Sequence, residues 1–332
     1  AGTAGSLDHD DGIEPEIPTI NGDLKTTHFR HNYPIPAYLI AIAVTNYQVY
    51  NQVTGTGPNQ FPIINYLYPE TYDANIPRLD QTPLIMEFFE SKFKLYPFKN
   101  EKYGHAQFGW GGGMEHTTVS FMVNFNRGLI AHELAHQWFG DDITCGSWND
   151  IWLNEGFATY LSSMVIENFD GESAFITNKN ALINSITSLP NGSVYVPLED
   201  ANNASRIFNS RLTYNKGAMV LNMLRFKLGE TNFFQGVNNY LNDPKLSYGY
   251  AKTPDLQTHL ETASGMSLTE FFNDWVYQQG YPLYDIQASP FDEGKIQINK
   301  TKKYFDFEKE IVQHNSLNPI DQLFASAERI EK

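Results

Sequence analysis

The sequence predicts an α+β fold, with a small mixed sheet followed by a helical lobe. Three observations support this prediction. Residues 38–50 form an apolar run rich in strand formers, two more strand-like segments flank a glycine-rich stretch at 111–116, and the chain from about 126 to 280 is mostly helical in pattern. A group of strands followed by a group of helices is typical of the α+β class.

The N-terminal third supplies one predicted strand and one predicted helix. Residues 1–34 are polar, acidic at the front and without periodicity, so we expect irregular structure there. The run at 38–50 predicts a strand whose sheet partners lie outside this sequence, and the two glycines and one proline of 51–60 predict a connection. Helical spacing over 83–93 predicts a helix that Pro97 ends.

The middle of the chain carries two predicted strands and two predicted helices. The strands are expected at 103–108 and 117–125, on either side of the glycine-rich stretch. A helix is expected at about 126–139 because its apolar residues share one side. A turn over 140–147 then leads to a second helix at about 150–167.

The C-terminal half is predicted to be mostly helical up to about residue 280. Thr253 and Pro254 suit the start of a helix, and residues 267–270 have the capping-box pattern. After Pro282 short strand-like runs return, as at 295–299.

These patterns predict three parts along the chain. Residues 1–55 are interpreted as the remnant of an N-terminal β domain with its linker, residues 56–282 as the main domain, and residues 283–332 as a short β or irregular segment. A strand without partners in front and an unfinished sheet behind indicate a piece of a longer protein.

Charge and composition exclude several classes of function. The 332 residues include 23 Lys and Arg against 38 Asp and Glu, a formal charge of −15 that argues against a nucleic-acid partner. The single cysteine, Cys145, excludes an internal disulfide framework. No apolar run approaches the ~20 residues that span a bilayer, and the first residues lack a signal-peptide pattern. The compartment is left open, with export slightly favoured.

The segment from His132 to His136, His-Glu-Leu-Ala-His, carries the clearest chemical signal. Histidines at i and i+4 of a helix lie on one face, with Cβ atoms ~5–6 Å apart, and can share one ion. Zinc binds imidazole nitrogen at ~2.0–2.1 Å in tetrahedral geometry and, when catalytic, keeps one position for water. Glu133 lies beside the first ligand and can reach that water as a general base. The pattern therefore needs a third ligand from elsewhere.

Glu155 is the candidate for the third ligand. Eighteen residues separate it from His136, and two antiparallel helices joined by a short turn would bring its carboxylate beside the histidine pair. The alternative is that Glu155 only stabilises a helix N-terminus and that the histidines are ordinary amphipathic positions. The motif together with a carboxylate at this spacing favours the metal site. Asp150 and Asn154 could orient a ligand histidine, but helix capping explains them equally well.

These residues give the chain a recognisable pattern, which resembles the gluzincin metallopeptidases and, within them, the aminopeptidase N family. Four motifs carry the resemblance in the family's order and rough spacing: Gly112-Gly-Met-Glu115, His132–His136, Trp148–Ala158 and Tyr214-Asn-Lys-Gly-Ala218. The resemblance covers about residues 38–282 and implies a thermolysin-like catalytic domain. Most of the family's N-terminal β domain and its C-terminal helical domain have no counterpart in this sequence.

The resemblance also implies catalytic roles. Glu133 would act as general base and then as general acid. Tyr214 matches the family tyrosine that donates a hydrogen bond to the tetrahedral intermediate. Without the Lys-Gly-Ala that follows it, Tyr214 would be interpreted as a core aromatic residue.

Substrate binding is implied for the glycine-rich stretch. Gly112, Gly113 and Met114 resemble the family strand whose backbone pairs with the peptide, and Glu115 resembles the glutamate that binds the free α-amine of the substrate. His116 stands where the family usually has Asn, a residue that contacts the substrate backbone. We expect this departure to affect the substrate range.

The sequence thus predicts a zinc-dependent aminopeptidase that acts on peptides with a free N-terminus. One Zn²⁺ per chain would be held by His132, His136 and Glu155. One alternative is a zinc endopeptidase, against which Glu115 argues. Another is a non-catalytic zinc-containing binding or scaffold module, against which the intact Glu133 argues. The oligomeric state is left open.

Overall fold

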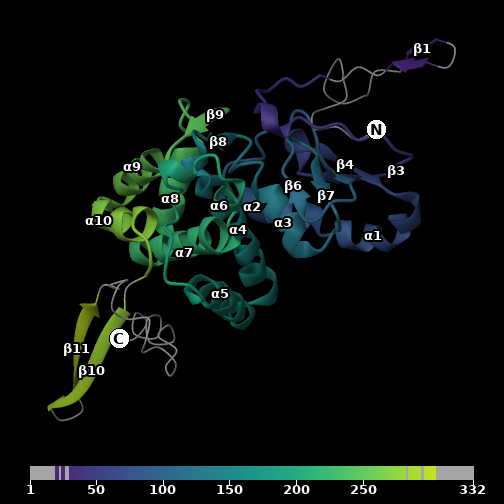
Figure 1. Cartoon of the computed structure of the whole chain (residues 1–332). Helices are drawn as coiled ribbons and strands as arrows, with labels where there is room; N and C mark the ends of the chain where they lie inside the picture. Colours follow the sequence, from purple (N-terminus) through teal and green to yellow (C-terminus); the bar gives the residue numbers. More distant parts are fainter. Residues whose placement is uncertain (1–18, 22–23, 27–29, 282, 293–294, 304–332) are drawn as a thin grey trace.

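The chain folds into a sheet lobe and a helical lobe that meet around α3 and α4 (Figure 1). The computed structural model describes residues 19–21, 24–26, 30–281, 283–292 and 295–303. The predictions for residues 1–18 and 304–332 lie outside the described residues. In the part of the chain that is described, no helix has the length and apolar character needed to cross a bilayer.

One lobe is built on a five-stranded mixed sheet with the order β3-β4-β5-β7-β6. The central β4–β5 and β5–β7 pairs are parallel, and the outer β3–β4 and β6–β7 pairs are antiparallel. The predicted small mixed sheet is therefore confirmed, and β6 is one of its edges. The strands are β3 (Gln48–Thr54), β4 (Phe61–Leu67), β5 (Tyr103–Gln107), β6 (Gly113–Met114) and β7 (Ser120–Met122).

The strand predicted at 38–50 is largely wrong. A single 3₁₀ turn, η1 (Ala37–Leu39), stands at its start, and regular pairing begins only at Gln48. Between them, Ala41 and Ala43 pack against the cluster of Tyr66, Ala106, Val119 and Phe121. The larger alternate residues are exposed: Ile40 60%, Ile42 76% and Val44 82%. Strand propensity alone does not supply a hydrogen-bonding partner, and the partner that does exist, β4, begins to pair at Gln48.

β3 also corrects two other expectations. It pairs with β4 along its whole length, so it is not a strand without partners. It extends to Thr54, into the stretch that was predicted to be a connection. The sheet therefore crosses the boundary predicted at residue 55.

The helical lobe follows the sheet in the sequence, as predicted. The sheet lobe contains α1 (Tyr72–Leu79) and α2 (Thr82–Lys92). The helices that follow are α3 (Arg127–Ala135), α4 (Trp152–Asp170), α5 (Glu172–Thr187), α6 (Ala204–Ile207), α7 (Gly217–Leu228), α8 (Glu230–Leu241), α9 (Thr253–Ser264) and α10 (Thr269–Phe272). Two π-helical stretches interrupt them, η6 (Ser210–Lys216) and η7 (Asn273–Tyr277). A short parallel pair, β8 (Ile143–Cys145) and β9 (Gly249–Ala251), ties the turn after α3 to the distal helices.

Several helix ends differ from the prediction for local reasons. α3 begins where the Asn126 side chain accepts a 2.9 Å hydrogen bond from the Leu129 N–H, and it ends at Ala135, so His136 is its C-cap. The capping box expected at 267–270 does not form, because Ser267 Oγ contacts Thr269 Oγ1 and α10 starts at Thr269.

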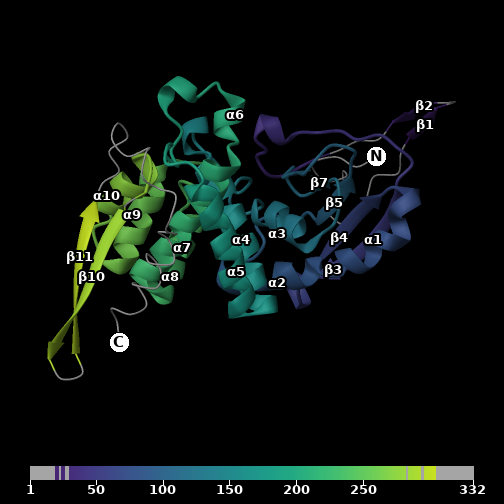
Figure 2. The ribbon, with the colours of Figure 1, turned by 60° about the horizontal axis from the view of Figure 1, so that its bottom comes forward.

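The terminal strands form two separate hairpins. β1 (Thr19–Asn21) pairs with β2 (Leu24–Thr26), and β10 (Leu283–Asp292) pairs with β11 (Lys295–Lys303). The strand-like runs expected after residue 282 are therefore confirmed within the described residues. The β10–β11 hairpin extends away from the helical lobe (Figure 2).

α4 lies at the centre of the molecule and packs against α3, α5 and α7 (Figure 2). Twelve of its nineteen residues are buried. At its crossing with α7, a Cβ atom on Gly156 would lie 3.1 Å from Gly217 Cα, and a Cβ on Gly217 would lie 3.1 Å from Gly156 Cα. The two helices can therefore approach this closely only because both positions lack a side chain.

We predict that Gly156→Ala destabilises the fold. The added methyl group would push α4 from α7, and overpacking of this kind costs about 1–3 kcal/mol. Gly128→Ala in α3 is the matched control, because its Cβ would meet Asn126 Oδ1 at an ordinary 3.5 Å. Urea unfolding of both variants tests this, and equal stability of Gly156→Ala and the unmodified protein would contradict the close helix crossing.

Candidate metal centre and active site

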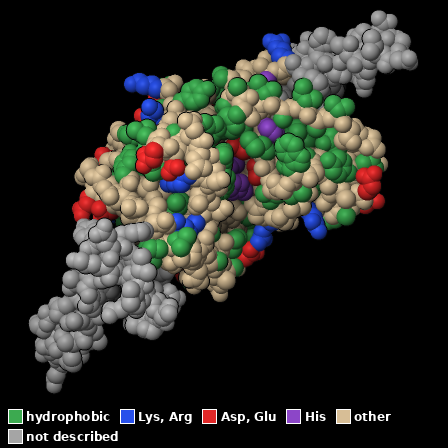
Figure 3. Space-filling view, viewed as in Figure 1, with side chains coloured by type: hydrophobic (Ala, Val, Ile, Leu, Met, Phe, Trp, Pro, Cys, Tyr) green, Lys and Arg blue, Asp and Glu red, His purple; other side chains and the backbone are tan. Residues whose placement is uncertain are grey.

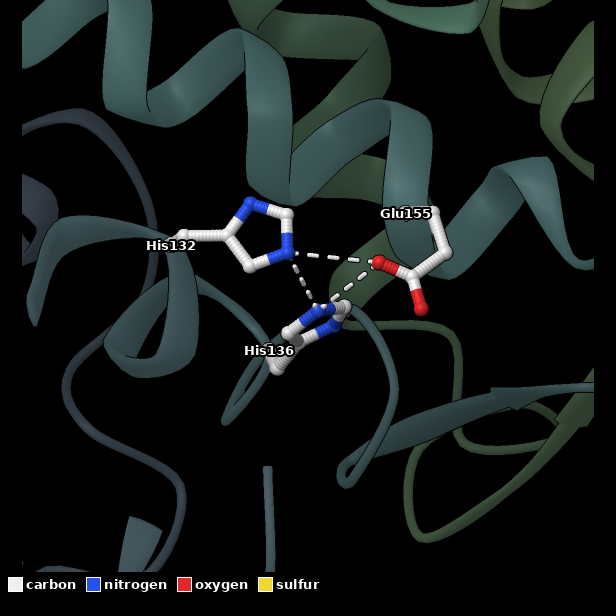
Figure 4. Close-up of side chains that lie close together, drawn as sticks. All are labelled: His132, His136 and Glu155. Carbon is white, nitrogen blue, oxygen red and sulfur yellow. Dashed lines mark hydrogen bonds and ion pairs between the residues drawn. The ribbon is translucent and has the colours of Figure 1, made fainter. Parts of the chain in front are cut away.

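Three side chains from two helices converge on one point (Figure 4). His132 Nε2 lies 3.2 Å from His136 Nε2, and Glu155 Oε2 lies 3.3 Å from each of these nitrogens. His132 belongs to α3, His136 caps it, and Glu155 lies in the first turn of α4. The structure therefore brings the three predicted ligands together.

The distances fit a tetrahedral zinc ion. With metal–ligand bonds of ~2.0–2.1 Å, two ligand atoms of a tetrahedron stand about 3.4 Å apart, close to the separations observed here. His136 Nδ1 lies 3.0 Å from the Phe139 carbonyl oxygen, which can only accept, so Nδ1 carries a proton. In the neutral ring Nε2 then has the lone pair that a metal ion requires. A bound zinc ion would polarise the substrate carbonyl and lower the pKa of a water molecule.

Glu133 points toward the glycine-rich strand. A Cβ atom on Gly113 would lie 2.3 Å from Glu133 Oε1, so the carboxylate rests against the backbone of β6. Glu133 Oε, Glu115 and His136 also form a second group whose ligand atoms lie within 4.8 Å of one another. Because Gly113 has no side chain, the carboxylate of the predicted base can lie against β6 at this position.

Tyr214 lies in the π-helix η6, directly before α7. Its ring stacks on the His132 ring, with centroids 6.0 Å apart and an interplanar angle of 12°. Burial and the nearby Glu155 carboxylate raise the pKa of the Tyr214 phenol far above its usual value, so the hydroxyl keeps its proton. Lys216 fixes the end of η6, because its buried ammonium donates to the Gly280 carbonyl at 2.8 Å.

These groups line a cavity of about 660 Å³ between the lobes. Histidine and acidic side chains show in the hollow at the centre of the face in Figure 3. The lining includes residues of β6, α3, α4, α5 and η6 together with Tyr38 and Phe208. Glu115, at the end of β6, contributes a carboxylate that is only 6% exposed.

The cavity is strongly acidic. Burial raises the pKa of Glu115, of Glu133 and, in the turn after α3, of Asp141. Burial also acts to raise the pKa of Glu155, but His136 and His132 outweigh it and hold that pKa well below its usual range. None of the lining residues that the structure places is Lys or Arg. Although burial acts to lower it, the carboxylates of Glu115, Glu155 and Glu133 raise the pKa of His136 well above its usual value, so the His136 ring carries the compensating positive charge where no metal ion or cationic ligand is bound.

Other side chains named from the sequence lie elsewhere. His116 Nδ1 lies 2.8 Å from the Leu39 carbonyl oxygen, and His116 is not among the residues that line the cavity. Asp150 accepts from the Thr253 N–H and hydroxyl at the start of α9. Asn154 bonds the Cys145 N–H and the Tyr38 hydroxyl. The suggestion that Asp150 or Asn154 orients a ligand histidine is therefore wrong.

Two residues at or near the site, Tyr38 and Asp141, are not predicted from the sequence. Tyr38 was assigned to a strand, although its side chain lines the cavity. Asp141 is buried, and neither carboxylate oxygen has a hydrogen-bond partner among the described residues. Nothing in the local pattern around either residue signals this placement, because both depend on contacts distant in sequence.

The fold and the site define the class of zinc metallopeptidases, in which two histidines and one glutamate hold a catalytic ion with one position open. Residues 78–275 match the Peptidase family M1 domain, and the chain belongs to that family. The predicted family, the α+β fold and zinc as the cofactor are thereby confirmed.

Relatives of known name agree with this membership. The chain is 28% identical to "Aminopeptidase M1-C" of Oryza sativa subsp. japonica and 29% identical to "Aminopeptidase 2, mitochondrial" of Saccharomyces cerevisiae, covering 82% and 90% of this chain. It spans only 33% of the length of each of these relatives. A crystal structure of the M1 zinc metallopeptidase from Deinococcus radiodurans, as a mutant bound to a Tyr-Ser-Ala substrate, superposes with a TM-score of 0.70 at 25% identity, covering 83% of this chain and 60% of that one.

We predict one zinc ion per chain, and we expect Glu133→Gln to retain it. Glu133 is not among the three converging ligands, so the variant should bind metal normally while its activity falls by several orders of magnitude. His136→Ala removes one ligand and should lose the ion. Elemental analysis after gel filtration measures both variants. Loss of zinc from Glu133→Gln, or retention of a full equivalent by His136→Ala, would overturn the ligand assignment.

Proposed function

We propose that this chain is a zinc-dependent aminopeptidase, which hydrolyses the first peptide bond of peptides with a free N-terminus. One observation carries the proposal: the carboxylate of Glu115 lies within 4.8 Å of ligand atoms of Glu133 and His136. The α-amine of a peptide is two bonds, about 2.5 Å, from the carbonyl carbon of its first residue. A carboxylate that binds this amine must therefore lie close to the metal and the base, as Glu115 does.

The acidity of the cavity supports recognition of an ammonium group. Glu115 is buried without a Lys or Arg among the placed lining residues, so an N-terminal ammonium supplies charge that the site lacks. An internal peptide bond offers no such charge. The relatives named above are called aminopeptidases, which agrees with this preference.

The edge of the sheet supports an extended peptide. Among the strands that the structure describes, β6 pairs only with β7, so its other edge can bind a peptide backbone as an added strand. Gly112, Gly113 and Met114 line the cavity along this edge. A peptide paired there would pass beside the Glu133 carboxylate, which rests against Gly113.

Two side chains carry the proton transfer and the charge stabilisation. Glu133 takes a proton from the attacking water and delivers it to the leaving amine. Its raised pKa, caused first by burial, suits a group that must hold the proton between these steps. Tyr214, held protonated beside Glu155, donates a hydrogen bond to the oxyanion.

The first test compares free and N-acetylated aminoacyl reporters. We expect the unmodified protein to cleave the free substrates far faster, because acetylation removes the charge that Glu115 binds. Glu115→Ala should narrow this gap by slowing the free substrates, since truncating one member of a buried ion pair costs about 2–5 kcal/mol. Glu87→Ala, an exposed glutamate on α2, is the control for net charge. Equal rates on free and acetylated substrates would contradict the aminopeptidase function and favour a zinc endopeptidase. If the zinc-loaded protein hydrolyses neither substrate, the result would favour a non-catalytic binding module.

The second test concerns Tyr214. Tyr214→Phe removes one hydroxyl and keeps the ring that stacks on His132. A single oxyanion donor is worth about 2.7–4 kcal/mol, so kcat should fall by about 10²–10³ with little change in KM. Steady-state kinetics measures this, and an unchanged kcat would make Tyr214 a packing residue.

A further inference from the structure

The turn η1 forms part of the cavity wall although it lies far from the motifs in the sequence. Its central residue, Tyr38, lines the cavity together with Glu115, His136 and Glu155. Tyr38 contacts Glu115, which follows it by 77 residues in the sequence. No local pattern links the two segments, so tertiary contacts alone must hold the turn in place.

The Tyr38 hydroxyl connects two residues of the site. It donates to Glu115 Oε1 at 3.5 Å, because a carboxylate oxygen can only accept. It accepts from Asn154 Nδ2 at 3.3 Å, and Asn154 is fixed in turn because its Oδ1 accepts from the Cys145 N–H at 3.0 Å. Burial, followed by the charge of Glu115, raises the pKa of Tyr38 far above its usual value, so the phenol keeps the proton that it donates.

The Tyr38 ring also has an aromatic packing partner. It packs edge-on against Trp148, with centroids 5.5 Å apart, and Trp148 packs against Phe208 at 6.1 Å. Trp148 precedes α4, the helix that carries the ligand Glu155. The orientation of the phenol is thus set by the same part of the chain that sets the metal site.

His116 holds the turn from the other side. Its Nδ1 donates to the Leu39 carbonyl at 2.8 Å, and its ring packs edge-on against Phe121 with centroids 4.7 Å apart. The side chain is 8% exposed and is not among the cavity-lining residues. Two consecutive residues therefore bind two consecutive residues of the turn. Glu115 accepts a hydrogen bond from the Tyr38 hydroxyl, and His116 donates one to the Leu39 carbonyl.

We propose that Tyr38 is a positioning residue that fixes the Glu115 carboxylate for the substrate ammonium, and that His116 holds Tyr38 there through the Leu39 carbonyl. The proposal rests on the proposed aminopeptidase function. It gives His116 a role in shaping the amine site in place of direct contact with the substrate backbone. It also makes η1 a functional part of the active site.

The decisive experiment is a double-mutant cycle with Tyr38→Phe and Glu115→Ala. Tyr38→Phe keeps the ring against Trp148 and removes only the hydroxyl. For free aminoacyl reporters we expect KM to rise about tenfold with kcat changed less, since the lost hydrogen bond goes to a charged group. In the Glu115→Ala background the same change should have almost no effect, because its target is gone.

Tyr248→Phe is the matched control. Tyr248 also loses one hydroxyl bond, a 2.8 Å donation to the Pro97 carbonyl, and it lies outside the cavity lining. We expect its KM to match that of the unmodified protein. Thermal unfolding of every variant shows whether a kinetic change reflects loss of the fold.

His116 is tested by two substitutions. His116→Ala removes the bond to Leu39 and should raise KM for free substrates about tenfold, less than additively with Tyr38→Phe. His116→Asn should raise KM less than His116→Ala does, because the Asn amide nitrogen is as many bonds from the backbone as Nδ1. A fall in kcat alone, equal for free and acetylated substrates, would overturn the proposal and indicate contact with the substrate backbone.

These experiments distinguish failure of the Tyr38 positioning role from failure of the proposed aminopeptidase function. If the unmodified protein does not distinguish free from acetylated substrates, the aminopeptidase function fails first. If it does, and Glu115→Ala abolishes the distinction, the function stands. Tyr38→Phe then overturns the positioning role if its effect is absent, or if it is equally large with and without Glu115.

Discussion

Helix α4 crosses α7 so closely that a Cβ atom on Gly156 or on Gly217 would lie 3.1 Å from the Cα atom of the other glycine. Glu155 precedes Gly156, and Tyr214 lies in the π-helix that runs into Gly217. The same crossing therefore sets the distance between a metal ligand and the predicted oxyanion donor. Because α4 also packs on α3, one helix fixes all three ligands relative to Tyr214.

The second constraint is electrostatic. Glu115, Glu133, Asp141 and Glu155 are buried close together, and the placed lining of the cavity contains neither Lys nor Arg. Burying so many carboxylates is costly unless cations neutralise them. Two cations would neutralise this negative charge. A divalent ion would bind at His132, His136 and Glu155 for catalysis, and a substrate ammonium would bind at Glu115 for recognition. In the proposed function, the charge excess that favours metal binding would also favour a substrate with a free amine.

The sequence predicts the parts of the site that are local or spaced along two consecutive helices. His132, Glu133 and His136 are local, and Glu155 follows because α3 and α4 are consecutive helices that pack against each other, although the segment between them contains β8 and is longer than the predicted turn. The π-helix around Tyr214 and the place of Tyr38 are not predictable in this way. Tyr38 sits in an apolar run that resembles a strand, and only its contacts with Glu115 and Asn154 show that it belongs to the cavity. β4 was missed because the prediction treated β3 as unpaired.

We expect one site to hold a metal ion and a free α-amine side by side. X-ray diffraction at the zinc absorption edge, from crystals grown with a free amino acid, tests it directly. We expect one anomalous peak ~2.0–2.1 Å from His132 Nε2, His136 Nε2 and a Glu155 oxygen, with the amine of the ligand hydrogen-bonded to Glu115. A peak elsewhere, or an amine bound away from Glu115, would contradict the account.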